Sequence, residues 1–180
     1  CDATAPADLW THQVQVVTES AAAWPAGRLL CDEVGMGKTV EAIMILRRLV
    51  AGRGVRRVLL VVPAGLRTQW QEELREKGGL IVPQLLVPQT LLWPDGSTEA
   101  VESIAVALEQ PLLLVSRELV RLEQNAAILM QATRWDLVLL DEAHAARRAQ
   151  QVEGEFNSAT LLLDLLRRLQ LEGRTRGILF

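Results

Sequence analysis

The sequence predicts an α/β fold, a parallel sheet flanked by helices, in one domain that spans residues 1–180. Short apolar runs alternate along the chain with helical patterns, which is typical of parallel sheets. The run at residues 58–62 contains only Val and Leu, as expected of a strand covered on both faces. A length of 180 residues corresponds to about one domain. Together these observations predict a sheet that lies buried between helices.

The individual elements follow from the spacing of apolar residues and from the residues that stop each run. Strands are expected where apolar residues follow one another without a break, at residues 28–31, 58–62, 112–115, 136–140 and from 177 onward. Helices are expected where apolar residues recur every three to four positions, at residues 11–23, 39–51, 117–131 and 158–170. A further helix has Leu66, Trp70 and Leu74 on one face and ends at Gly78. The later part of 141–150 is also expected to be helical.

The segment between residues 80 and 110 has the weakest pattern. Pro83, Pro88 and the turn-forming run at 93–96 interrupt it. We expect a short strand, a turn and then a helix over residues 99–108. This segment is also where we expect a function specific to a subgroup of related proteins.

Composition limits the classes of function. Asp plus Glu exceed Lys plus Arg by 22 to 19, so bulk positive charge cannot be what holds a nucleic acid. With 49% apolar residues the chain has enough material for a core, which excludes a disordered tail. The two cysteines, Cys1 and Cys31, form neither a disulfide framework nor a zinc motif. No run of about 20 apolar residues exists, so we expect a cytoplasmic protein without membrane contact.

A glycine-containing loop at residues 32–39 joins a predicted strand to a predicted helix. Gly35 and Gly37 allow the backbone to turn its N–H groups toward phosphate oxygens, and the helix start favours an anion. Lys38 can reach the β and γ phosphates, and the Thr39 hydroxyl can ligate Mg²⁺. Asp32 stands where the common pattern has its first glycine. The alternative is a plain glycine-rich turn with a surface lysine.

The second motif is acidic. Asp141 and Glu142 follow an apolar strand, at the edge of the sheet where ligands of such folds bind. Asp141 fits the carboxylate that holds Mg²⁺, and Glu142 fits the group that orients the attacking water. A helix N-cap is the other interpretation of this pair. The presence of both motifs in one chain favours phosphoryl-transfer chemistry.

The two motifs together resemble the first RecA-like motor lobe of superfamily-two helicases, in the Swi/Snf-related branch and of bacterial type. The Asp32-Glu33 form of the loop is characteristic of that branch, and His12-Gln13 resembles the motif that reads adenine. The resemblance implies ATP and Mg²⁺ as cofactors, with Lys38, Asp141 and Glu142 as catalytic groups and Thr39 and Asp141 on the metal. The residues it implies for ATP binding are Gln13, Asp32, Glu33, Gly35, Met36, Gly37, Lys38 and Thr39.

The same resemblance implies contacts to a nucleic-acid backbone. Segment 61–70 is similar to motif Ia and implies such contacts for Pro63 and Gln69. Segment 114–117 is similar to motif Ib and implies them for Ser116 and Arg117, although Ser116 could equally be a helix N-cap. Trp70 fits a core position better than a stacking platform. His144 is implied to couple the nucleotide state to the following motif.

We therefore expect an ATP-dependent translocase on double-stranded DNA, with functions such as polymerase recycling or phage defence. The partners implied are duplex DNA, a second RecA-like lobe and a protein bound to the DNA. The chain begins with Cys1 and stops before the Ser/Thr-Ala-Thr motif of the family, so we expect a fragment that hydrolyses ATP very poorly by itself. The alternatives are a DEAH-type RNA helicase lobe, which the Asp32-Glu33 loop disfavours, and a nucleotide-binding scaffold that does not hydrolyse ATP.

Overall fold

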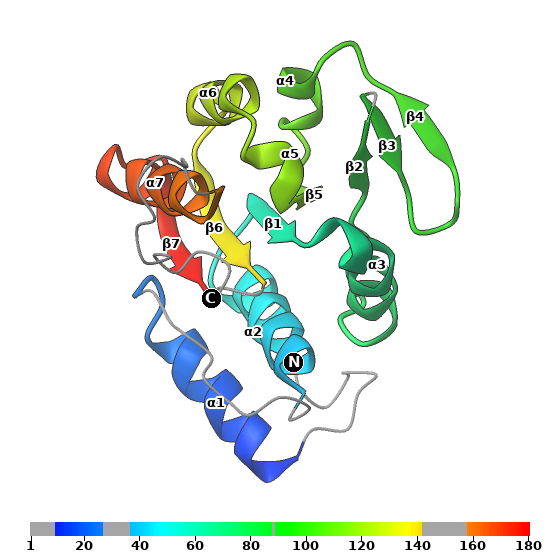
Figure 1. The fold of residues 1–180 in the computed structure, drawn as a ribbon. Coiled ribbons are helices and arrows are strands. Elements are labelled where there is room, and N and C mark those ends of the chain that lie inside the picture. Colours follow the sequence, from blue (N-terminus) through cyan, green and yellow to red (C-terminus); the bar gives the residue numbers. More distant parts are fainter. Residues whose placement is uncertain (1–9, 27–36, 88, 142–157) are drawn as a thin grey trace.

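The computed structural model describes residues 10–26, 37–87, 89–141 and 158–180. Among these residues, seven strands form one sheet in the order β4-β3-β2-β5-β1-β6-β7 (Figure 1). The strand predicted at 28–31 and the segment 142–150 lie outside the described residues. Within the described residues, no helix is both long enough and apolar enough to cross a membrane.

Four neighbouring strands, from β5 to β7 at one edge of the sheet, are parallel and confirm the predicted fold class. They are β5 (Leu112–Ser116), β1 (Val58–Val62), β6 (Trp135–Leu140) and β7 (Thr175–Leu179). Every residue of β1 is buried. Because successive side chains of a strand point to opposite faces, Leu59 and Val61 enter one core while Val58, Leu60 and Val62 enter the other.

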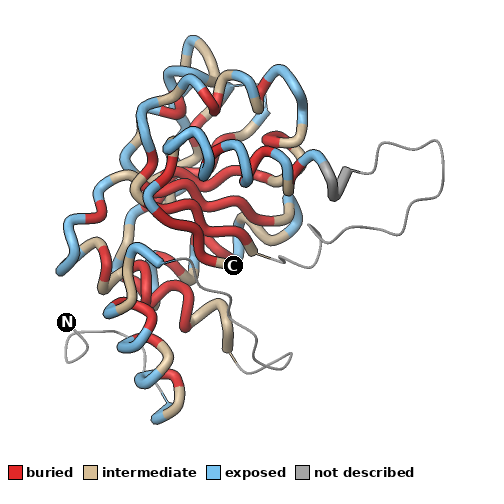
Figure 2. The backbone as a smooth tube through the Cα atoms, turned by 90° about the vertical axis from the view of Figure 1, so that its left-hand side faces the viewer, coloured by how far each residue is buried: buried red, intermediate tan, exposed pale blue. Residues whose placement is uncertain are grey.

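Helices cover both faces of this sheet. The helices that pack on the Leu60 face are α1 (Thr11–Ala22), α2 (Lys38–Gly52) and α3 (Arg67–Glu76), the last preceded by the short 3₁₀ turn η2 (Ala64–Leu66). Those on the Leu59 face are α4 (Ile104–Ala107), α5 (Arg117–Val120), α6 (Glu123–Gln131) and α7 (Ser158–Leu171). Figure 2 shows the buried strands stacked in the middle of the molecule, with exposed residues on the outer helices. The result is a three-layer α/β/α arrangement.

Two predicted elements were wrong in detail. The helix expected over 117–131 is divided into α5 and α6, with Leu122 in extended conformation between them. The helix expected over 99–108 is reduced to α4, because residues 98–100 form a strand instead.

The segment 84–100 forms an extension at the other end of the sheet, made of β2 (Gln84–Leu86), β3 (Thr90–Leu92) and β4 (Thr98–Ala100). β2 pairs in parallel with β5, and the pairing of neighbouring strands within the extension is antiparallel. Local turn chemistry accounts for it. The Asp95 carboxylate accepts hydrogen bonds from the backbone N–H and the hydroxyl of Ser97, at 2.9 and 2.6 Å. Gly96 has a φ of 87°, which favours glycine. This turn reverses the chain and pairs β3 with β4.

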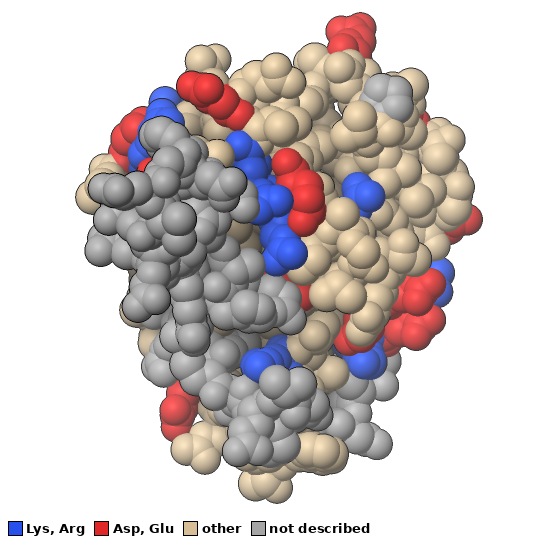
Figure 3. Space-filling model, viewed as in Figure 1, with Lys and Arg blue, Asp and Glu red and all other residues tan. Residues whose placement is uncertain are grey.

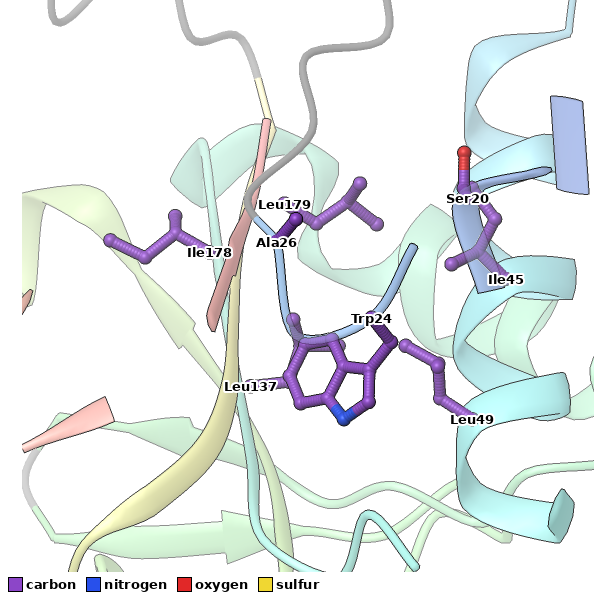
Figure 4. Close-up of a pocket in the computed structure, with 8 residues that line it drawn as sticks. All are labelled: Ser20, Trp24, Ala26, Ile45, Leu49, Leu137, Ile178 and Leu179. Atoms are coloured by element: carbon purple, nitrogen blue, oxygen red, sulfur yellow. The ribbon is translucent and has the colours of Figure 1, made fainter. Parts of the chain in front are cut away.

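The end of α1 is anchored against the sheet by Trp24. In Figure 4 the indole ring lies between Leu49 of α2 and Leu137 of β6, and beside them is a cavity of about 10 Å³. Gly177 of β7 makes room for this ring, since a Cβ atom there would come within 2.6 Å of Trp24 Cζ3. The cavity has space for about one water molecule at most. A nucleotide must therefore bind elsewhere.

Candidate nucleotide and metal site

The beginning of α2 has the backbone geometry of an anion site. Gly37 is the N-cap residue and has a left-handed conformation, with φ 81° and ψ 28°. Lys38 and Thr39 are the first two residues of the helix and are half-buried. The first N–H groups of a 15-residue helix have no acceptor within the helix and attract an anion there. Figure 1 shows the arrowheads of β6 and β7 pointing toward the side on which α2 begins.

Gln13 lies against this helix start. Its Oε1 accepts a hydrogen bond of 3.0 Å from the Trp10 backbone N–H, which fixes the side chain at the beginning of α1. A Cβ atom on Gly37 would come within 2.7 Å of Gln13 Nε2, and the φ of 81° at Gly37 also favours glycine there. The fold thus brings Gln13 and Gly37 together over 24 residues of sequence. The role of Gln13 in reading adenine stays a prediction.

A second contact joins α1 to α2 and was not expected from the sequence. Glu41, in the first turn of α2, is fully buried, and its carboxylate lies 3.9 Å from His12 Nε2. The His12 ring also packs against the exposed Trp10 ring, at 5.6 Å between centroids. His12 therefore lies next to the first turn of α2, while Val17 and Ala21 of α1 pack in the same core as α2.

Asp141 stands at the carboxyl end of β6. Its backbone N–H donates a hydrogen bond of 3.0 Å to the carbonyl of Val61, so the end of β6 is held next to the end of β1. The Nε1–H group of Trp70 donates to Asp141 Oδ2 at 2.7 Å. Trp70 is only 3% exposed, which confirms its predicted place in the core. Sequence reasoning missed the bond itself, although a buried indole N–H usually has an acceptor.

The two segments expected to contact nucleic acid follow neighbouring strands. Val62 of β1 pairs with Ser116 of β5, so Pro63 and Ser116 lie at the same edge of the sheet. Gln69 is exposed and donates to Glu73 at 3.0 Å. Ser116 is buried, and its hydroxyl accepts from the Leu119 N–H at 3.1 Å. Ser116 is therefore the N-cap of α5, the alternative left open by the sequence.

Glu118 links the same two segments. It accepts from Arg117 Nε at 2.9 Å and from the backbone N–H of Ala64 in η2 at 3.0 Å, and it lies 4.0 Å from Arg121. Burial raises the pKa of Glu118, but the hydrogen bonds from Arg117 and Ala64 outweigh it and hold the pKa below its ordinary value. Figure 3 shows basic side chains gathered next to acidic ones in the region of α5. Arg117 thus lies at the expected surface and is ion-paired there.

The residues present fit a magnesium nucleotide. Thr39 and Asp141 supply a hydroxyl and a carboxylate oxygen, the hard ligands that Mg²⁺ prefers, and Mg²⁺ commonly takes the rest from phosphate and water. Within the described residues, no group of three or more His, Cys, Asp or Glu side chains could hold a metal alone. The predicted site residues Asp32, Glu33, Gly35, Met36, Glu142 and His144 lie outside the described residues.

The class of protein now follows from comparison with known families. The model of the SNF2-related domain matches residues 11–173. The chain belongs to this family, as the resemblance predicted.

The most similar relatives include bacterial proteins. One is the uncharacterized ATP-dependent helicase YqhH of Bacillus subtilis, 32% identical over 145 residues, which covers 81% of this chain and 23% of that protein. Another is the RNA polymerase-associated protein RapA of Pseudomonas aeruginosa, 33% identical over 157 residues, which covers 86% of this chain and 16% of that protein. The chain therefore spans less than a quarter of the length of these curated relatives.

Solved structures bear out the fold. The SWI2/SNF2 ATPase core of Sulfolobus solfataricus in complex with double-stranded DNA matches with a TM-score of 0.68 at 14% identity, over 97% of this chain and 32% of that one. A second structure of the same ATPase core domain matches with a TM-score of 0.63 at 16% identity, over 96% of this chain and 30% of that one. At these identities the likeness concerns the fold.

Proposed function

We propose that this chain is the first motor lobe of an ATP-dependent translocase that moves on double-stranded DNA. In this proposal residues 1–180 form the ATP-binding RecA-like domain, and a second lobe of the same cytoplasmic protein completes the site. The object of the movement is a protein bound to the DNA. The observation that carries the proposal furthest is the packing of Gln13 on left-handed Gly37 at the start of α2. This packing supports a role for the Gln13 amide in reading the base and for the start of α2 in binding the phosphates.

Each residue has a defined task in this proposal. Lys38 and the first N–H groups of α2 hold the β and γ phosphates, and Glu142 orients the attacking water. Thr39 and Asp141 hold Mg²⁺, which when bound neutralises phosphate charge. An arginine from the second lobe would raise the rate by about 10³ to 10⁵. The isolated chain is therefore expected to bind ATP and to hydrolyse it very slowly.

Duplex DNA as the track is supported by two points. The Pro63 and Ser116 segments lie on the same edge of the sheet as Asp141. The Sulfolobus ATPase core of the same fold was solved with double-stranded DNA. Because the net charge is −3, the proposed binding depends on a few backbone contacts and not on bulk attraction.

The first test uses the only two lysines of the sequence, Lys38 and Lys77. In the full-length protein, Lys38→Ala is expected to abolish ATP turnover. Lys77 forms an ion pair with Glu73 at 3.1 Å beyond the end of α3, so Lys77→Ala is the matched control and should leave turnover unchanged. Steady-state phosphate release measures both. Normal hydrolysis by Lys38→Ala would contradict the assignment of the loop.

The second test separates binding from hydrolysis and identifies the track. Glu142→Gln is expected to keep ATP bound while hydrolysis is lost; loss of binding would mean that Glu142 is itself a ligand. Phosphate release should rise most with duplex DNA, less with single-stranded DNA and least with RNA. Strongest stimulation by RNA would overturn the choice of track in favour of an RNA helicase.

A further inference from the structure

The hydrogen bond between Trp70 and Asp141 joins two motifs that sequence analysis treated separately. Trp70 is the fourth residue of α3, within the segment that resembles motif Ia, and Asp141 directly follows β6. The two residues are 71 positions apart, and their donor and acceptor lie 2.7 Å apart. We propose that Trp70 is a positioning residue that orients the Asp141 carboxylate for Mg²⁺. This inference rests on the proposed function, because it assigns Asp141 to the metal.

The geometry allows this role because a carboxylate by itself is poorly oriented. Rotation about the last torsion of an aspartate side chain is broad and roughly two-fold, so an isolated Asp141 would present its oxygens in many directions. An indole Nε1–H is a donor only, and a hydrogen bond to an ionised acceptor is short and strong. With Oδ2 held by Trp70, the direction of Oδ1 is restricted as well.

Trp70 is itself firmly placed, which an orienting group requires. It is 3% exposed and packs in the core between the sheet and α3. The beginning of α3 is held by a hydrogen bond of 2.9 Å from the Leu66 N–H to the Pro63 carbonyl and by one of 3.0 Å from Arg67 Nη1 to the Leu85 carbonyl. The donor therefore cannot follow the carboxylate if the latter rotates.

A purely structural role is the competing explanation, and Trp135 provides the comparison. Trp135 begins the same strand, β6, and is fully buried. Its Nε1 atom has no hydrogen-bond partner among the described residues. Packing of a buried indole in this sheet therefore does not demand an acceptor, so the Trp70 bond is a separate feature. Groups that hydrogen-bond metal ligands typically change metal affinity or activity by about 10- to 100-fold when they are removed.

The first experiment compares Trp70→Phe with Trp135→Phe in the full-length protein. Both changes keep a buried aromatic ring, and only the first removes a hydrogen bond to Asp141. Binding of a fluorescent ATP analogue is measured as a function of Mg²⁺ concentration. Trp70→Phe is expected to raise the Mg²⁺ concentration for half-maximal binding about 10-fold, while Trp135→Phe leaves it unchanged.

The second experiment uses the unaltered protein, so it does not depend on how a variant folds. With ¹⁵N-labelled tryptophan, the indole N–H resonance of Trp70 is expected to shift when Mg²⁺ is added to the nucleotide complex. The resonance of Trp135, at the other end of β6, is expected to stay in place. Thermal melting of both variants gives their stability.

The outcomes distinguish this inference from the proposed function. If the unaltered protein fails to bind ATP with Mg²⁺, the proposed function is wrong. If it binds, but Trp70→Phe has the same Mg²⁺ dependence as Trp135→Phe, only the positioning role is wrong. A Trp70 resonance that does not move on Mg²⁺ binding overturns the role in the same way.

Discussion

The parallel half of the sheet and its antiparallel extension are built on different principles. In the parallel half, β1 is buried at all five positions and pairs with strands on both sides. In the extension, each strand has three residues, and β4 is exposed at all three. The first region is buried between two layers of helices. In the second, Leu85 and Leu91 reach the core, and the turn at Asp95–Ser97 connects β3 to the exposed β4.

The difference between the parallel strands and the extension indicates where the chain can tolerate substitutions. The candidate site residues Pro63, Ser116 and Asp141 all lie at ends of the parallel strands. A loss of packing there would disturb the site, while the extension could vary with little effect on it. Four pairs of substitutions test this difference between the two regions.

The largest effect is expected from the centre of the parallel half. Leu60 is fully buried on β1, and Leu60→Ala should lower the free energy of unfolding by about 3 kcal/mol through lost burial and a cavity. Thr98 is exposed on β4, and Thr98→Ala should change it by less than about 0.5 kcal/mol. Denaturant unfolding measures both. Equal losses would contradict the distinction between the two regions.

A steric test of the parallel half uses Gly177 on β7. A Cβ atom there would meet Trp24 and come within 2.8 Å of the Pro25 carbonyl oxygen, so Gly177→Ala should destabilise the fold by about 2 kcal/mol. Trp24→Leu in the same protein removes the ring and should restore part of the loss in a double-mutant cycle. Simple additivity of the two changes in thermal melting would show that the ring is not the obstacle.

The corresponding glycine of the extension is Gly96. No atom lies within 4 Å of a Cβ built there, but its φ of 87° is unfavourable for other residues, so Gly96→Ala should cost about 1 kcal/mol. Gly52, at the end of α2, has equal space and no positive φ. Gly52→Ala should be neutral or stabilising. A comparable loss at Gly52 would mean that conformation is not the cause at Gly96.

The smallest effect on stability is expected from removing the charge of one of two carboxylates, Asp136 or Asp95. Burial raises the pKa of Asp136 on β6, but hydrogen bonds from the Arg56 and Arg57 N–H groups and from Arg176 outweigh it and hold the pKa below its ordinary value. A lowered pKa contributes stability that is present above the ordinary value of 3.8 and is lost as the pH falls through the lowered pKa. Asp136→Asn should thus lower stability by about 0.5–1 kcal/mol at pH 7, with the difference disappearing in acid.

Asp95 in the extension is the matched control for that measurement. Hydrogen bonds from the Ser97 side chain and backbone lower its pKa in the same direction, but the carboxylate is exposed to solvent. Asp95→Asn should therefore change the pH dependence of unfolding less than Asp136→Asn does. Denaturant midpoints between pH 2 and pH 7 compare the two, and a larger change at Asp95 would contradict the importance of burial.

The same comparison explains how much could be predicted from the sequence. β1 was predicted to the residue, because its Val-Leu run is bounded by Pro63. The extension was predicted only in part: one short strand and a turn were expected and are present, but β3 and β4 were missed. Strands of three residues are too short to show a period, and the turn at Gly96 decides their pairing. The division after Val120 was missed because the apolar pattern continues through Leu122.

The candidate site also has features that the sequence predicted and one that it did not. The place of Asp141 at a strand end and of Gly37 at a helix start followed from local patterns. The bond from Trp70 to Asp141 joins segments 71 residues apart, and no local pattern contains that information. The sequence predicted only that Trp70 is buried, and burial alone does not identify the acceptor of its N–H group.

The order of the strands has one more consequence. β1 lies between β5 and β6, so the strand ends that carry Ser116 and Asp141 are separated by two strand spacings, or about 10 Å. Backbone hydrogen bonds set that separation, and no side-chain substitution at these positions changes it. The sheet therefore fixes the distance between the proposed metal ligand and the proposed DNA-binding edge. Any movement of one relative to the other has to take place in the loops beyond the strands.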